Sequence, residues 1–76
     1  MLILGRQFEF VVASDASCDG IRLELVELVD DGRQTLADIS YSDRDGTMTL
    51  QTFEGEVPVE AIEATIKEAR HRFGER

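Results

Sequence analysis

Three carboxylates of this sequence would stand in a row if its predicted strands pair as neighbours. In that pairing Glu9 lies opposite Glu24, and Glu24 lies opposite Asp38, with Glu27 nearby. Like charges directly opposite each other destabilise a sheet, so the row points to a cation site or a contact for a basic protein. The alternative is a solvated face whose side chains splay apart, because exposed charges interact weakly in water.

Three apolar residues are predicted on the same face as the carboxylates. Val11, Leu36 and Phe53 are too apolar for a fully solvated sheet, and such a patch on a polar face is typical of an association surface. Partial cover by residues 2–4 or by the C-terminal tail is the alternative. We predict that these three residues, with Glu9, Glu24 and Asp38, form a protein-binding surface.

One turn carries part of a calcium-loop pattern. With Gly46 at loop position six, Asp43 and Asp45 stand at positions three and five. Positions one and twelve, where carboxylate ligands belong, hold Tyr41 and Thr52. The flanking segments also read as strands, so we predict a hairpin turn at residues 43–46 and no calcium site.

The remaining reactive side chains are sparse. Cys18 is the single cysteine and His71 the single histidine, so no zinc ligand set is available. Nothing orients the two as a nucleophile and base, although sequence alone leaves that pair open. Phosphate-binding glycine loops and aromatic-basic platforms are missing from the sequence. We therefore predict no catalytic residue, no metal site and no cofactor.

The charge of the chain is acidic and unevenly placed. Of 76 residues, 16 are acidic and 8 basic, a net charge of −8; residues 1–56 hold 12 acids and 4 bases, and residues 57–76 hold 4 of each. This charge disfavours nucleic acid and anionic membranes and favours a basic partner, although solubility alone also explains it. A lone cysteine and the lack of a signal peptide or membrane-spanning run predict a cytoplasmic protein.

A C-terminal helix organises the rest of the chain. Helical spacing over residues 58–73 predicts one apolar stripe, made of Val59, Ile62, Ile66, Ala69 and Phe73. Pro58 suits the first helical position, and Gly74 suits the stop. A helix with one apolar face needs a surface to cover.

Alternating patterns before the helix predict that surface. Four strands are expected, at residues 6–13, 21–29, 34–42 and 47–54, with residues 2–4 as a further extension of the first strand. The apolar positions switch parity between Leu23 and Leu28, which predicts a β-bulge where Leu25 and Val26 together oppose one residue near Ala37. The expected fold is one α+β domain over residues 1–76, a four-stranded antiparallel β-meander with the C-terminal helix on one face (ββββα).

The hairpins followed by Glu56-Val57-Pro58-Val59-Glu60 and an amphipathic helix resemble small bacterial proteins, a resemblance that implies no site residues. Small size and acidity favour a non-enzymatic protein-interaction domain that self-associates as a homodimer, because so short a chain gains little from its own core. An inhibitor or immunity-type protein that binds a basic target is a more specific form of this hypothesis. The alternative is a small enzyme or metal-dependent module that uses the carboxylate row.

Overall fold

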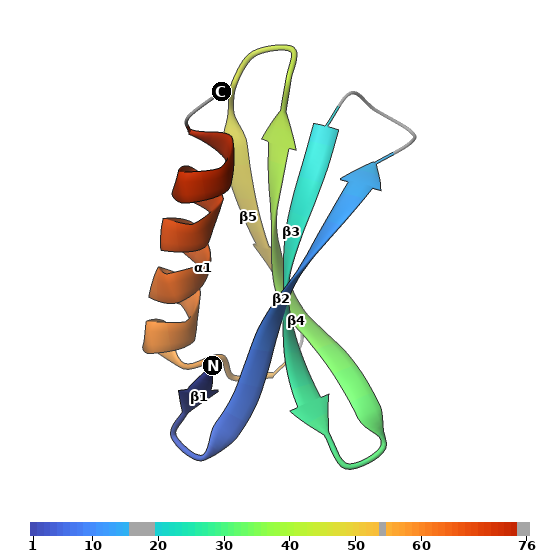
Figure 1. The fold of residues 1–76 in the computed structure, drawn as a ribbon, viewed down its shortest axis with the longest axis vertical. Helices are drawn as coiled ribbons and strands as arrows, with labels where there is room; N and C mark the ends of the chain where they lie inside the picture. Colours follow the sequence, from blue (N-terminus) through green and yellow to red (C-terminus); the bar gives the residue numbers. More distant parts are fainter. Residues whose placement is uncertain (16–19, 54, 75–76) are drawn as a thin grey trace.

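The computed structural model describes residues 1–15, 20–53 and 55–74. It is a β-meander with one helix on one face (Figure 1), in which each strand pairs antiparallel with the next along the chain. The α+β class and the antiparallel sheet are confirmed, but the sheet has five strands rather than four. The elements are β1 (Leu2–Ile3), β2 (Arg6–Asp15), β3 (Gly20–Val29), β4 (Gly32–Ser42), β5 (Met48–Thr52) and α1 (Val59–Phe73).

The additional strand comes from the first residues of the chain. Leu4 and Gly5 both have positive φ, 53° and 76°, so they form a tight two-residue turn. The turn folds β1 back onto β2 and pairs Ile3 with Arg6. Leu2 and Ile3 therefore form a separate edge strand, with Leu4 in the turn after it, and not the expected extension of β2.

The predicted register is correct between β3 and β4 up to the bulge, where Leu23 pairs with Ile39, but it is shifted in the other two predicted hairpins. The alternating pattern predicts Phe10 opposite Leu23 and Tyr41 opposite Leu50, whereas Phe10 pairs with Leu25 and Tyr41 pairs with Met48. Both shifts are of two residues, and a shift of two keeps every side chain on its predicted face. The turn between β3 and β4 is residues 30–31, one residue earlier than the Asp31-Gly32 turn that the sequence predicts.

The predicted bulge lies at the expected place but on the other strand. Leu25 pairs with Ala37 and Val26 with Thr35, so the extra residue is Leu36 of β4. Beyond the bulge, Val26 stays on the face away from the helix and Glu27 on the helix face. The prediction that Leu25 and Val26 share one partner is therefore wrong.

The helix packs through small residues. Its buried residues are Ala61, Thr65, Ala69 and Phe73, one turn apart along one side of α1. The Thr65 hydroxyl donates a hydrogen bond to the Ala61 carbonyl at 2.7 Å, so a buried polar group is satisfied. Of the predicted apolar stripe, Ala69 and Phe73 are buried as expected. Val59 is exposed, and Ile62 and Ile66 are partly buried at the side of the contact. Within the described residues, no helix is long and apolar enough to cross a bilayer.

Two clusters of side chains fill the space between helix and sheet. The first joins the start of the helix to the bulge and contains Phe8, Leu25, Leu36, Ala37 and Ala61. The second joins the end of the helix to the centre of the sheet and contains Leu23, Ile39, Ala69 and Phe73. Tyr41 stacks on Phe73 with ring centroids 5.4 Å apart.

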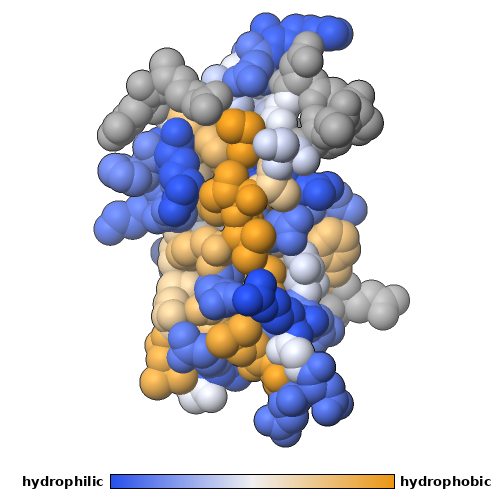
Figure 2. Space-filling view, turned by 45° about the vertical axis from the view of Figure 1, so that its right-hand side comes forward, coloured by the Kyte–Doolittle hydropathy of each residue, from blue (hydrophilic) through white to orange (hydrophobic). Residues whose placement is uncertain are grey.

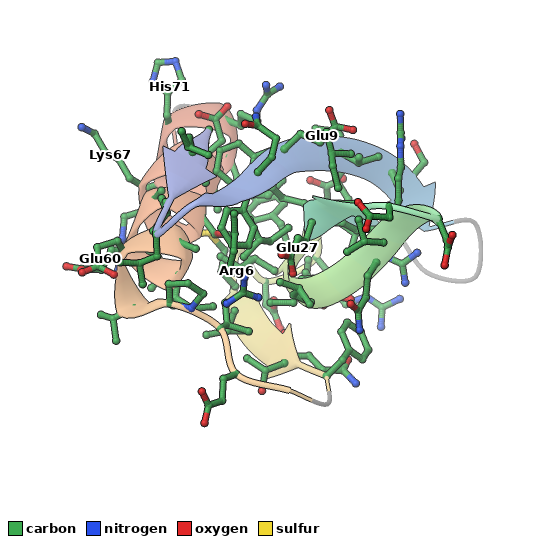
Figure 3. All side chains as sticks on the ribbon, turned by 90° about the horizontal axis from the view of Figure 1, so that it is seen from below. Arg6, Glu9, Glu27, Glu60, Lys67 and His71 are labelled. Atoms are coloured by element: carbon green, nitrogen blue, oxygen red, sulfur yellow. The ribbon has the colours of Figure 1, made fainter. Side chains whose placement is uncertain are left out.

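An ion pair closes the core beside β1. The Arg6 guanidinium donates two hydrogen bonds to the Glu27 carboxylate, at 3.0 and 2.9 Å, and lies over the Phe8 ring (Figure 3). It also donates a hydrogen bond to the Glu56 carbonyl at 3.3 Å, which attaches the segment before the helix to β2. The hydrogen bonds with Arg6 lower the pKa of Glu27. Glu60 and Lys67 project from α1 away from the sheet (Figure 3).

Candidate interaction surface beside the helix

One helix is too narrow to cover this sheet. Strands lie about 4.8 Å apart, so five of them span roughly 20 Å, whereas a helix with its side chains is about 10 Å across. Helix α1 packs on β3 and β4, the strands at the centre of the helix-facing side. Helix-facing side chains near the two edges, such as Val12 on β2 and Leu50 on β5, are consequently left partly exposed, although Phe8 of β2 is fully buried.

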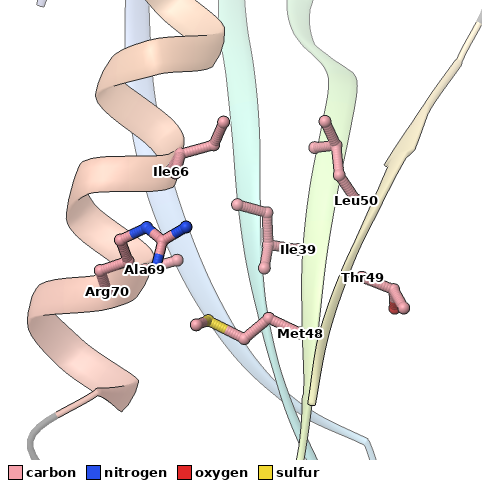
Figure 4. A pocket seen from close by; sticks show the side chains of 7 residues that line it. All are labelled: Ile39, Met48, Thr49, Leu50, Ile66, Ala69 and Arg70. Atoms are coloured by element: carbon pink, nitrogen blue, oxygen red, sulfur yellow. The ribbon is translucent and has the colours of Figure 1, made fainter.

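On the β5 side, these side chains form an apolar groove. The groove has a volume of about 160 Å³ and opens to solvent between α1 and β5 (Figure 4). Met48 and Leu50 form the strand wall and are 36% and 46% exposed. Ile66 and Ala69 form the helix wall, and Arg70 is the single charged residue among those that line it.

The outward backbone groups of β5, which lie beside this groove, also have no hydrogen-bond partner among the described residues. Hydrogen bonds from Ser42 N–H to Thr47 C=O and from Phe53 N–H to Leu36 C=O, both 3.0 Å, place odd-numbered residues of this segment against β4. Backbone polar groups alternate in direction along an antiparallel strand. Met48, Leu50 and Thr52 therefore direct their N–H and C=O groups away from the sheet.

In the part of the chain that the structure describes, strand β5 has none of the features that protect an edge strand. Natural edge strands avoid pairing with other chains through charges, proline, bulges or very short length. Residues 48–52 are Met-Thr-Leu-Gln-Thr, without a charge, proline or bulge, and all five are exposed. An unprotected edge beside an apolar groove is a surface suited to binding another polypeptide strand.

The β2 side of the helix is different. There a wider hollow is lined by Val12 and Ile21 together with charged or titratable helix side chains. Glu68 and Arg72, four residues apart, form the ion pair that their spacing favours. Its other lining residues are His71 and Phe73. The space-filling view shows a vertical band of apolar surface that polar residues interrupt, with both polar and apolar patches on its flanks (Figure 2).

The predicted carboxylate row is only partly assembled. Glu24 lies opposite Asp38 as expected, but the register shift places Glu9 opposite Val26, so the row of three is wrong. Arg33 lies 3.4 Å from Glu9, and Arg22 lies 3.6 Å from Glu24. Among the described residues, no group of three or more His, Cys, Asp or Glu side chains could hold a metal ion.

Asp38 is the unusual member of this face. Its side chain is nearly buried, at 6% exposure, although it lies on the face that the helix does not cover. We find no hydrogen bond to it within the described residues. Its carboxylate oxygens are not among the buried atoms that lack a partner in the described part of the chain, where Arg22 Nε is the one such atom, so solvent and equally a cationic group can reach them.

The predicted apolar patch does not form. Leu36 is 3% exposed and packs in the first core cluster, because the bulge turns it toward the helix. Its placement on the outer face is therefore wrong. Val11 lies opposite Glu24 on the outer face, and Phe53 is exposed just after β5.

The turn at residues 43–46 is the hairpin that the sequence predicts. Gly46 N–H donates to Ser42 C=O at 2.8 Å, and the Asp45 carboxylate accepts hydrogen bonds from the Thr47 hydroxyl and backbone N–H. These bonds lower the pKa of Asp45. The proposed pairing of Cys18 with His71 is untested, because Cys18 lies outside the described residues.

Sequence reasoning did not select Met48 and Leu50 as binding residues. Alternation over residues 47–54 predicts a strand with Met48 and Leu50 on its apolar face, and that face is expected to lie under the helix. The available signal was the ratio of strands to helices, since one helix cannot cover four or five strands.

Comparison of the chain with protein-family models, curated proteins and solved structures gives no match. The geometry of the β5 edge and of the groove beside it is therefore the basis for assigning a function.

Proposed function

We propose that this protein is a non-enzymatic protein-interaction domain that binds an extended polypeptide segment along β5. The bound segment would pair with the outward N–H and C=O groups of Met48, Leu50 and Thr52 as an added strand. Its side chains on the helix side would enter the groove against Leu50 and Ile66. The backbone would contribute affinity, and the groove would select apolar residues at alternate positions.

This proposal rests on one observation: an unpaired strand edge and an exposed apolar groove lie side by side. Among residues 1–15, 20–53 and 55–74, the outward hydrogen-bonding groups of β5 have no partner and no protecting charge, and the groove beside them exposes apolar side chains. Either feature alone occurs on ordinary domains. Together they match the two requirements of strand addition, which are backbone pairing and pockets for alternate side chains.

The proposal is tested with a synthetic peptide that repeats the edge strand, Gly-Thr-Met-Thr-Leu-Gln-Thr-Phe-Glu, which is residues 46–54 of the chain. We expect its titration to shift the NMR amide signals of residues 48–52 and the methyl signals of Ile66 and Leu50. A control peptide with the same sequence except for proline in place of its leucine cannot donate the central hydrogen bond and should bind more weakly. Shifts confined to β2, or identical shifts with both peptides, would contradict the proposal.

A second candidate function is binding of a basic target through the outer face. Its support is the buried Asp38 carboxylate opposite Glu24, on a chain with a net charge of −8. A lysine or arginine of the target would form charge-assisted hydrogen bonds with Asp38 and Glu24. A basic model protein such as lysozyme is a simple probe. Binding that weakens steeply with salt and is lost in Asp38→Asn would support this candidate, whereas binding insensitive to Asp38→Asn would exclude it.

A further inference from the structure

We infer that the strand bound along β5 is the β5 strand of a second copy of this chain, paired antiparallel about a two-fold axis at Leu50. This inference rests on the proposed function and names its partner. In that pairing Leu50 lies opposite Leu50 of the second copy, and Met48 lies opposite Thr52. The product is one continuous ten-stranded sheet with both helices on the same side.

The hydrogen-bond pattern of β5 selects this register. Only the even-numbered residues, Met48, Leu50 and Thr52, direct backbone groups outward. A two-fold axis at Leu50 pairs these residues only with each other, as Leu50–Leu50 and Met48–Thr52. Each such pair exchanges two backbone hydrogen bonds in an antiparallel ladder. No outward N–H or C=O of β5 is then left unpaired.

The side chains are compatible with the same axis. On the helix side, Leu50 meets its own copy and Met48 meets Thr52, so apolar surface that is now exposed becomes buried. On the opposite side, Thr49 meets Gln51. All of these residues are uncharged, so the seam brings no like charges together.

The surface of the isolated chain also favours association. A compact monomer of 8.5 kDa has an accessible surface of about 4,700 Å² and, at 76 residues, a radius of gyration of about 11.4 Å. This chain has 5200 Å² and 12.6 Å. The surplus of roughly 500 Å² relative to a compact monomer is surface that a second copy can cover.

The charge of the chain sets how this dimer responds to salt. Each copy carries a net charge of −8, so the two copies repel over long range although the seam is neutral. Added salt screens that repulsion, and dimerisation should strengthen. A complex with a basic target responds in the opposite direction.

The first test is sedimentation equilibrium of the intact chain at 10 to 200 μM, at low and moderate salt. We expect a monomer–dimer equilibrium with a dissociation constant in the micromolar range, because a five-residue edge makes a small interface. The constant should fall as salt rises. A monomer mass at about 100 μM in moderate salt would overturn the inference. Binding of the residue 46–54 peptide in the same sample would then show that the proposed function survives without it.

The second test probes the axis itself through cysteine cross-linking. In a Cys18→Ser background, Leu50→Cys places two thiols opposite each other, whereas Met48→Cys places them about 14 Å apart along the seam. Both sites are partly exposed, so both variants should fold. We expect rapid disulfide dimer formation for Leu50→Cys and at least tenfold slower formation for Met48→Cys. Equal rates, or faster cross-linking at position 48, would refute the register.

Discussion

The two edges of the sheet are treated differently by this chain. On the β2 side, β1 folds back and pairs with Arg6 and Gln7, and the hollow beside the helix carries Glu68, His71 and Arg72. On the β5 side, no charge or further strand of the described residues covers Met48–Thr52, and the groove is apolar except for Arg70. A very short edge strand and nearby charges are recognised protections against unwanted pairing.

The difference shows that exposure alone does not mark a binding surface. Val12 is 47% exposed on the β2 side and Leu50 is 46% exposed on the β5 side, so a list of exposed residues does not distinguish them. Unpaired backbone does not separate them either, because β1 pairs only with the start of β2, and residues 9–15 of β2 have no strand on that side among the described residues. What separates the two sides is charge, since charged helix side chains line the hollow beside β2, whereas β5 is neutral and its groove is apolar except for Arg70. An exposed apolar side chain, unpaired backbone and a neutral strand thus occur together. This combination is present at β5, and that is why the proposal is placed there.

The largest expected effect separates the covered centre of the sheet from its exposed edge. Leu23→Ala removes a fully buried side chain beneath the helix and should lower the free energy of unfolding by about 2–5 kcal/mol. Leu50→Ala changes a half-exposed side chain and should cost the monomer less than about 1 kcal/mol. Urea denaturation at low protein concentration measures both. Similar losses would show that the helix covers β5 as well as β3.

A charge placed on each edge tests the comparison directly. Leu50→Lys puts two ammonium groups at the two-fold axis and should weaken dimerisation at least tenfold, or about 1.4 kcal/mol. Val12→Lys adds the same charge at a residue of equal exposure on the other edge and should leave the dissociation constant within about twofold. Sedimentation equilibrium of the two variants decides. If Val12→Lys is the more damaging, the interface lies on the β2 side.

A smaller effect is expected at the turn that forms the protected edge. Leu4 is 80% exposed and has φ of 53°, a conformation that asparagine tolerates better than leucine. Leu4→Asn should therefore stabilise the fold by about 0.5–1 kcal/mol in urea denaturation. Leu2→Asn, which removes a similarly exposed leucine without relieving any backbone strain, is the control. Equal gains in stability for both variants would mean that the more polar surface, and not relief of backbone strain, causes the effect.

The smallest effect concerns the ion pair beside β1. Because the pKa of Glu27 in the folded state is below its ordinary value of 4.5, the pair stabilises the fold above that pH, and this contribution is lost as pH falls through the folded pKa. Glu27→Gln should consequently lower the free energy of unfolding at pH 7, with a difference that shrinks below pH 4.5. Glu63→Gln on the exposed helix surface should show no such trend. A pH-independent loss in Glu27→Gln would indicate that shape, and not charge, is what matters there.

The sequence by itself determined the fold class and most of the facing. Alternation of apolar residues predicted β2 to β5 and the side of each strand that meets the helix, because a shift of two residues leaves faces unchanged. The parity switch near Leu25 predicted that a bulge exists, and helical spacing predicted α1 to within one residue of its start. These features are local, and local patterns carry them.

Only the tertiary structure decided which strand absorbs the bulge and which apolar residues remain uncovered. A parity switch is satisfied equally by an extra residue in β3 or in β4, and the choice of β4 moved Leu36 from the predicted outer patch into the core. Likewise, the sequence marked Met48 and Leu50 as facing the helix, but the width of one helix against five strands left them exposed. Coverage depends on the relative size and placement of packed elements, which no single stretch of sequence encodes.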